Sequence, residues 1–402
     1  MLCQFSFQNF KSYREETVFD FQAASIPEFS DSLLKAEKCS SLLPVGVVYG
    51  PNGGGKTNLL QALSCVISTV VKPIRDLEKN RQPLIIQQKI DAEPFLYDTA
   101  SAEKPTEFQL YFRTGEYEYR YYLGILKGEI AAEALDRKKI GGKKPAHIFY
   151  RDGEGISLGT ILNKEGVNTS VNVKMPFLSF LAINYNIPVI AEVQEWFESC
   201  VIRSYANPVA EMEVMVSEDV YFKKMFLMLL KDIGIDVSDY RVDLKENQLY
   251  LKREVGGNEY ELTFEHESDG TRKLIAALPV LLVALREGRL VIIDELDAKL
   301  HPKLLRYVIS MFTNPRINQY GAQLLFTSHD MSTMKNTVFR RDEIWFAALD
   351  ESHSSEIYSL YEIRREDNER VNSTAAFDKQ YLEGRYGADP YLRNMLDGGG
   401  WK

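Results

Sequence analysis

Residues 45–58 read VGVVYGPNGGGKTN, and this stretch decides the fold. The β-branched run at residues 45–49 predicts a short buried strand. It leads directly into a complete G-x-x-x-x-G-K-T motif at residues 50–57, and residues 58–70 then carry apolar side chains at helical spacing. A strand, a glycine-rich loop and a helix in this order are what a phosphate-binding loop requires.

The loop residues suit the triphosphate of ATP. Glycines let backbone N–H groups curl around phosphates without Cβ clashes, and the start of the helix adds a favourable dipole. Lys56 is expected to neutralise phosphate charge, and Thr57 to present its hydroxyl to Mg²⁺. The nucleotide-binding residues expected in this stretch are Asn52, Gly53, Gly54, Gly55, Lys56, Thr57 and Asn58.

A second strand motif carries two carboxylates. Residues 290–295 read LVIIDE, four apolar residues followed by Asp294 and Glu295. Next to a phosphate-binding loop, Asp294 is expected to reach Mg²⁺, and Glu295 to orient or deprotonate the attacking water. Because an isolated buried carboxylate is strongly disfavoured, a metal or water partner is expected for this pair.

A third strand predicts a histidine close to the same site. Residues 323–330, QLLFTSHD, are apolar and then polar, so His329 should lie at the tip of a buried strand. In ABC-type ATPases a histidine in this position senses the γ-phosphate. We therefore expect Glu295, His329 and Lys56 to form the catalytic group.

ABC-type sites are completed by a serine–glycine signature from a second protomer. Ser268 and Gly270, in ESDGT, match that signature and precede a predicted helix over residues 272–287. Pro279 should kink this helix. Taken alone, Ser268 would equally serve as the N-cap of the helix. Since a chain cannot easily present its signature to its own phosphate-binding loop, the motif implies a homodimer or a higher homo-oligomer.

The whole chain has 402 residues, of which 45% are hydrophobic, enough for two or three domains. The fold class expected is α/β: an ABC-type P-loop head with a mixed central sheet, a flanking antiparallel β-subdomain and a helical insertion. Alternating residues at 106–126 predict hairpin strands of the subdomain. The boundaries expected are an N-terminal lobe at 1–180, the insertion at 181–240 and a C-terminal lobe at 241–402.

The composition indicates in which cellular compartment the protein is expected. No apolar stretch is long enough to predict a membrane span, and residues 1–10 lack the features of a signal peptide, so a cytoplasmic protein is expected.

The net charge of −9 argues against broad electrostatic coating of nucleic acid, although a local patch could bind it. The basic run at 136–145 is best interpreted as a solvated turn. Four scattered cysteines, without a CxxC pair, predict reduced thiols.

Several segments together resemble one family. The segments are NFKSY at 9–13, GPNGGGKTNLLQAL at 50–63, ESDGTRKL at 267–274, DELDAKLHP at 294–302 and FDKQYLEGRYGADP at 377–390. The first resembles the opening of RecF- and SMC-type ATPases, and the others are similar to the RloA-like ATPases, the fifteenth class of the AAA scheme. The resemblance implies that Lys11 reaches the nucleotide phosphates, although a solvated lysine is an equal alternative.

This chain departs from the ABC pattern at the glutamine that normally contacts Mg²⁺ from the side. No glutamine ends the expected strand. The nearest candidate is Glu133, for which we favour a surface carboxylate.

The resemblance also implies a biological role. It indicates an ATP- and Mg²⁺-dependent ATPase that acts as the sensor or regulatory subunit of a bacterial anti-phage defence (abortive infection) system. Such a subunit controls a separate effector from a neighbouring gene, an RloB-like protein or a nuclease or toxin. A RecF-like repair ATPase is the alternative. An intrinsic nuclease is less favoured, because the residues after His329 are too few for a TOPRIM domain, and the acidic run around Glu366, Asp367 and Glu369 is best interpreted as solvated.

Overall fold

The computed structural model describes residues 1–36, 38–77, 91–163, 165–208, 220–243, 248–364 and 368–388. Its strands are β1 (Leu2–Gln8), β2 (Thr17–Asp20), β3 (Val45–Tyr49), β4 (Thr106–Thr114), β5 (Tyr117–Leu126), β6 (Glu129–Lys139), β7 (Ala146–Asp152), β8 (Gly155–Leu158), β9 (Val201–Arg203), β10 (Asp239–Asp243), β11 (Gln248–Val255), β12 (Asn258–Thr263), β13 (Leu290–Ile293), β14 (Gln323–Thr327), β15 (Ile344–Leu349) and β16 (Ser355–Ser359). Its α-helices are α1 (Lys56–Arg75), α2 (Thr160–Asn163), α3 (Phe177–Asn184), α4 (Pro188–Ser199), α6 (Val220–Asp232), α7 (Asp269–Glu287), α8 (Pro302–Thr313) and α9 (Phe377–Leu382), with short 3₁₀ turns between some elements.

The central sheet determines where the candidate site forms. Its strand order is β16-β15-β3-β14-β13-β9, and every neighbouring pair is parallel except β15 with β16. Parallel strands end at the same edge of a sheet, so the loops after β3, β13 and β14 meet there. All residues of these three strands are buried, as their continuous apolar runs predict.

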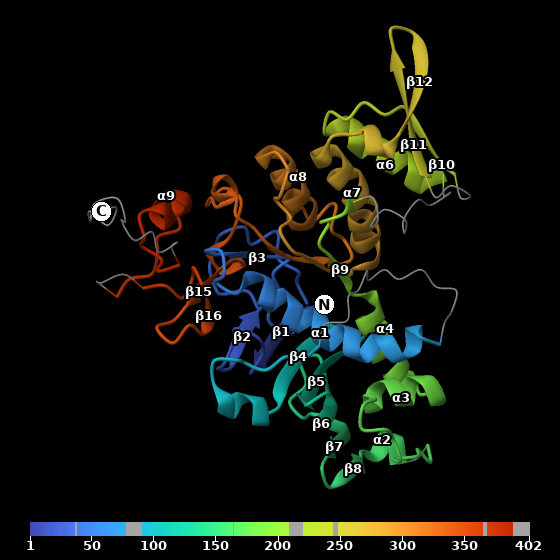
Figure 1. Ribbon diagram of the computed structural model, residues 1–402, viewed down its shortest axis with the longest axis vertical. Helices are drawn as coiled ribbons and strands as arrows, with labels where there is room; N and C mark the ends of the chain where they lie inside the picture. The colour runs from blue at the N-terminus through green and yellow to red at the C-terminus, as the bar shows by residue number, and fades with distance from the viewer. Residues whose placement is uncertain are drawn as a thin grey trace, which may run out of the picture.

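Helix α1 lies between the central sheet and a second sheet (Figure 1). The second sheet is antiparallel, in the order β2-β1-β4-β5-β6-β7-β8, and contains the hairpin predicted at residues 106–126. Buried residues of α1 pack with aromatic side chains of β1, β4 and β5 in one core. By length and composition α1 could cross a membrane, but 61% of its apolar window is buried here, as in the core helix of a folded domain.

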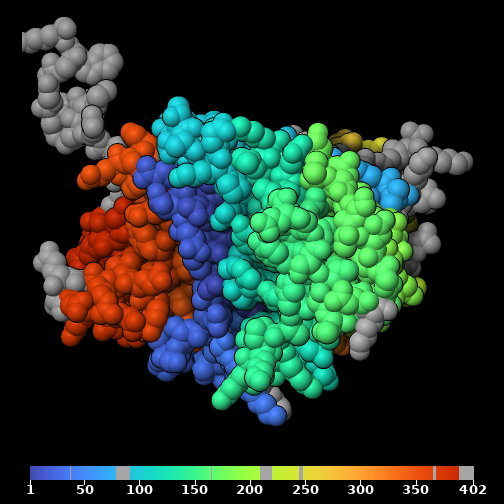
Figure 2. Space-filling model, turned by 90° about the horizontal axis from the view of Figure 1, so that it is seen from below, coloured from blue at the N-terminus to red at the C-terminus, as the bar shows by residue number. Residues whose placement is uncertain are grey.

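A second core covers the other face of the central sheet, where α6, α7, α8 and α9 pack against it. Beyond α6 and α7, a small antiparallel sheet of β10, β11 and β12 projects from the body, at the end of the long axis opposite to β8 (Figure 1). From below, N-terminal residues in blue separate the teal and green antiparallel subdomain from the orange C-terminal segments (Figure 2).

The fold class expected from the sequence is confirmed: a mixed central sheet with a flanking antiparallel subdomain. The interval expected to be a helical insertion differs in one respect, because it also contributes β9 to the central sheet, parallel to β13. Three residues are too few to show a strand period. The domain boundaries themselves stay a prediction. Of the family-like C-terminal motif, Asp389 and Pro390 lie outside the described residues, as do Glu366 and Asp367.

Candidate nucleotide site

The loop after β3 is built as a phosphate cradle. A Cβ added at Gly54 would lie 2.7 Å from the carbonyl oxygen of Ala347, so strand β15 excludes any side chain there. Gly53 faces open space and has φ +80, which is left-handed backbone that glycine adopts readily. The loop is therefore closed on the protein side and open on the other, where its N–H groups can meet an anion.

Lys56 begins α1 and points back over the loop. Its Nζ donates hydrogen bonds to the carbonyl oxygens of Gly50 at 2.8 Å and Pro51 at 2.9 Å. Burial lowers the pKa of Lys56, and the nearby carboxylates of Asp294, Glu295 and Asp297 act in the opposite direction. The cation is thus held at the mouth of the cradle, facing the acidic residues that follow β13.

The expected metal ligands are adjacent. The Thr57 hydroxyl donates to Oδ2 of Asp294 at 2.9 Å, although the two residues are 237 positions apart in the sequence. Hydroxyl and carboxylate oxygens are the ligands that Mg²⁺ prefers. The pair therefore fits Mg²⁺, which would be held by Thr57 and Asp294 together with nucleotide phosphates.

Thr327, at the end of β14, organises the acidic pair. Its buried hydroxyl donates to Oδ1 of Asp294 at 2.6 Å and accepts a hydrogen bond from the Glu295 N–H at 2.7 Å. Glu295 itself has φ 48, in the left-handed region, and its side chain is exposed. Thr327, two residues before His329, thus holds the Asp294 carboxylate and the Glu295 backbone, a role that sequence reasoning missed. A hydroxyl at the end of a buried strand was its only signal.

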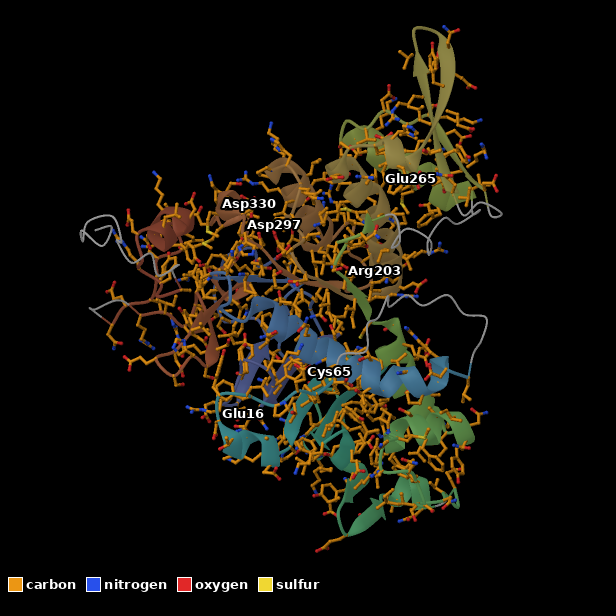
Figure 3. All side chains as sticks on the ribbon, in the orientation of Figure 1. Glu16, Cys65, Arg203, Glu265, Asp297 and Asp330 are labelled. Carbon is orange, nitrogen blue, oxygen red and sulfur yellow. The ribbon has the colours of Figure 1, made fainter. Side chains whose placement is uncertain are left out.

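His329 and the turn after Glu295 are also joined. The His329 N–H donates to Oδ2 of Asp297 at 2.9 Å, and the His329 side chain is exposed. Figure 3 shows Asp297 close to Asp330, the residue after His329, at the upper edge of the central sheet. The structure thus joins the backbone of His329 to the turn that follows Glu295, and the role of His329 as a sensor of the γ-phosphate stays a prediction.

Residues near the N-terminus brace the phosphate loop from behind. The Tyr13 hydroxyl donates to the carbonyl oxygen of Gly55 at 3.1 Å. The Ser12 hydroxyl contacts the Ser355 hydroxyl at 2.7 Å and accepts a hydrogen bond from the side-chain amide of Asn58 at 2.8 Å. Asn58 therefore helps to hold the loop in place. Sequence reasoning did not assign this support to Ser12 and Tyr13.

Lys11 lies alongside α1. Its Nζ donates to Oε1 of Gln61 at 2.8 Å, and its backbone has φ 50. Gln61 is four residues after Thr57, on the same side of the helix. Lys11 is thus about one helical turn from the metal ligand, and its contact with nucleotide stays a prediction.

The signature residues start α7. The Ser268 hydroxyl accepts a hydrogen bond from the Thr271 N–H at 3.3 Å, so within this chain Ser268 is the N-cap. A Cβ added at Gly270 would lie 2.5 Å from the carbonyl oxygen of Lys299, so the helix start abuts the turn after Glu295. Pro279 lies inside α7, which continues through it.

Glu133 does not belong to this site, and its interpretation as a surface carboxylate is wrong. It is 0% exposed and accepts hydrogen bonds from the N–H groups of Phe177 and Leu178 at the start of α3, and from the Tyr121 hydroxyl. Burial raises the pKa of Glu133, and these hydrogen bonds oppose the shift. The alternation of residues along a strand does not reveal that one of its carboxylates caps a helix that is distant in the sequence.

The strand beside β13 is β9, which ends at Arg203 (Figure 3). The Asp294 N–H donates to the carbonyl oxygen of Arg203 at 3.1 Å.

Comparison with known proteins finds one matching family and two similar solved structures. A family model described as "AAA domain, putative AbiEii toxin, Type IV TA system" matches residues 46–160 and 172–335. No curated protein matches. Two similar solved structures are the SMC head domain from Thermotoga maritima and an SMC head bound to the C-terminal winged-helix domain of ScpA. Both are 12% identical. They cover 89% of this chain and 98% and 97% of their own, with TM-scores of 0.41 and 0.45.

The matched intervals contain the phosphate loop, the signature, both carboxylates and the histidine, and they make up more than half of the chain. The chain therefore belongs to the family of AAA domains described as putative AbiEii toxins of type IV toxin–antitoxin systems.

Proposed function

We propose that this protein binds ATP with Mg²⁺ and hydrolyses it at composite sites formed between two copies of the chain. The observation that carries the proposal is the Thr57–Asp294 contact of 2.9 Å, at the mouth of a glycine cradle and beside Glu295. An exposed carboxylate on a backbone that is held by hydrogen bonds, next to a metal-binding pair, is the arrangement that phosphoryl transfer to water needs.

Each residue then has a defined task. The loop N–H groups and Lys56 bind the β- and γ-phosphates, and bound Mg²⁺ would neutralise the charge that develops on them. Glu295 orients a water molecule and accepts its proton as the water oxygen bonds to the γ-phosphorus. The bond from phosphorus to the bridging oxygen breaks, and its electron pair leaves with ADP. In this proposal His329 senses the γ-phosphate.

The signature residues need a second protomer. Ser268 and Gly270 lie at the start of α7, whose N–H groups are suited to an anion. In the proposed dimer, this helix start of one chain meets the γ-phosphate bound by the other chain. Ser268→Arg should then leave nucleotide binding intact and block turnover, whereas Lys56→Ala should abolish binding.

Within the cell, we propose a cytoplasmic regulatory ATPase of a phage-defence system that controls a separate effector from a neighbouring gene. The family description supports a two-component setting of this kind, since it names one partner of a type IV toxin–antitoxin pair. The same description favours a second candidate, in which this chain is itself the toxin. Nucleic acid stays a possible ligand.

The first test is the mass of the purified Glu295→Gln protein with ATP and Mg²⁺, with and without the product of the neighbouring gene. An ATP-dependent dimer or larger ring that captures the neighbour supports the proposal. An assembly that ignores the neighbour and binds DNA supports a repair ATPase.

Growth of cells that express the chain alone separates the regulator from the toxin. Growth arrest that is relieved by the neighbouring gene would identify this chain as the toxin. Arrest that requires both genes would support a regulator of an effector.

A further inference from the structure

A buried lysine connects the signature helix to the catalytic glutamate. Lys273 lies on α7, five residues after Ser268, and is 3% exposed. Its Nζ donates to the carbonyl oxygen of Glu295 at 2.6 Å and to that of Ala298 at 3.1 Å. A buried ammonium is costly unless it is well hydrogen-bonded, so these contacts fix the position of its head group.

The backbone of Glu295 is held from both sides. Its N–H donates to Thr327 in β14, and its carbonyl oxygen accepts from Lys273 in α7. Its φ of 48 is a conformation that glutamate rarely adopts, so it requires support from the surroundings. Because the direction of a side chain follows from its backbone, Lys273 helps to determine where the Glu295 carboxylate points.

The start of α7 and the turn after Glu295 also touch elsewhere. Lys299 Nζ bonds to Oδ2 of Asp269 at 2.8 Å, and the hydrogen bonds from Lys299 and Arg272 lower the pKa of Asp269. Gly270 packs directly on the carbonyl oxygen of Lys299. A displacement of the helix start would therefore be passed to this turn.

We propose that Lys273 is a positioning residue that sets the geometry of Glu295 according to the position of the signature helix. The inference rests on the proposed function, in which that helix binds the nucleotide held by the partner chain. Engagement of the helix at one composite site then adjusts the catalytic glutamate of the other, so the two ATP sites of a dimer are coupled through Lys273.

The test is Lys273→Met, which keeps the buried stem and removes the donors. Turnover should fall about 10- to 100-fold, because a misplacement near 1 Å can cost 10²-fold. The Kd for a fluorescent ATP analogue should stay within about twofold of the wild-type value, since the two hydrogen bonds that the change removes go to the turn after Glu295. Lys273→Arg, which keeps a cationic donor, should recover most of the turnover.

Lys299→Met is the matched control. It breaks a contact between the same helix and the same turn, but its exposed side chain does not touch Glu295. We expect less than about a twofold loss, as for other exposed ion pairs. An equal loss of turnover in both variants would show that any contact between this helix and this turn supports turnover as well as Lys273 does, and the proposal would be overturned.

A second readout separates positioning from mere support of the signature. In the Glu295→Gln background, adding Lys273→Met should leave the ATP-induced dimer within about threefold of its original Kd, because the signature residues are intact. Loss of the dimer would overturn the proposal. If Lys273→Met does not fold, Lys273→Gln, whose amide is too short to reach both carbonyl oxygens, takes its place with the same expectations.

A failure of the proposed function would give a different result from a failure of the role proposed for Lys273. In that case the wild type itself shows no ATP hydrolysis or no ATP-dependent dimer. Normal hydrolysis by the wild type, together with normal turnover of Lys273→Met, would refute the role of Lys273 alone.

Discussion

Thr327→Val is the sharpest test of how the acidic pair is organised. Valine nearly matches threonine in shape, so the change replaces the hydroxyl without opening a cavity. It removes the donor to Asp294 Oδ1 at 2.6 Å and the acceptor for the Glu295 N–H at 2.7 Å. Both groups lie at the site proposed to bind Mg²⁺ and water, so the geometry of the catalytic carboxylates should loosen.

The magnitude follows from these two bonds. A hydrogen bond to a charged group contributes about 1.5–3 kcal/mol. If this is lost in the transition state, kcat falls roughly 10- to 150-fold, since about 1.36 kcal/mol corresponds to a factor of ten. The unsatisfied N–H of Glu295 should also lower the free energy of unfolding by about 1–3 kcal/mol. The Kd for ATP should change little, because the phosphate loop is untouched.

The assay is steady-state release of phosphate at saturating ATP, together with urea unfolding of the same preparation. Thr327→Ser, which keeps the hydroxyl, is the control and should retain most of the turnover. A Thr327→Val protein that hydrolyses ATP within twofold of the wild-type rate would refute the assignment of Thr327 as the organiser of Asp294 and Glu295.

Two further predictions concern buried carboxyl groups outside the site. Glu133→Ala should lower the free energy of unfolding by roughly 3–5 kcal/mol, because it leaves two buried N–H groups at the start of α3 without their acceptor and removes the buried ion-pair partner 3.9 Å from Arg151. Turnover per folded molecule should persist, and its loss at unchanged stability would place Glu133 in the catalytic machinery instead. Burial raises the pKa of Glu343 to about 8 from its ordinary 4.5. Between these pH values the folded state keeps a proton that the unfolded state loses. The free energy of unfolding should therefore fall as pH rises from 4.5 to 8, and then stay constant. Glu343→Gln should therefore be more stable than the wild type at pH 8–9, with a gain of at most about 1.4 kcal/mol for each pH unit of the shift. Urea unfolding at pH 5 and pH 8.5 checks this, and an equal difference at both pH values would contradict it.

The sequence by itself determined the local chemistry of the site. The segments around Lys56, Asp294 and His329 each combine a short continuous apolar run with a polar or glycine-rich end, a pattern consistent with buried strands, and the structure forms them. The sequence predicted a mixed central sheet, and in the structure β3, β14 and β13 pair in parallel, which brings these polar ends to one edge. The contact between Thr57 and Asp294 followed from that topology.

Only the tertiary structure decided which groups hold these residues in place. Thr327, Lys273 and Tyr13 act through hydrogen bonds to residues that are distant in the sequence, and no periodicity reveals such a partner. Strand β9 escaped detection because three residues fit either period, and it is a strand because β13 offers an edge for it to pair with. The sequence around Glu133 suggests a surface carboxylate, yet α3 packs over it, so Glu133 is buried and accepts hydrogen bonds from the first N–H groups of that helix. Local patterns fix what each segment can be, whereas packing across the chain fixes what each side chain does.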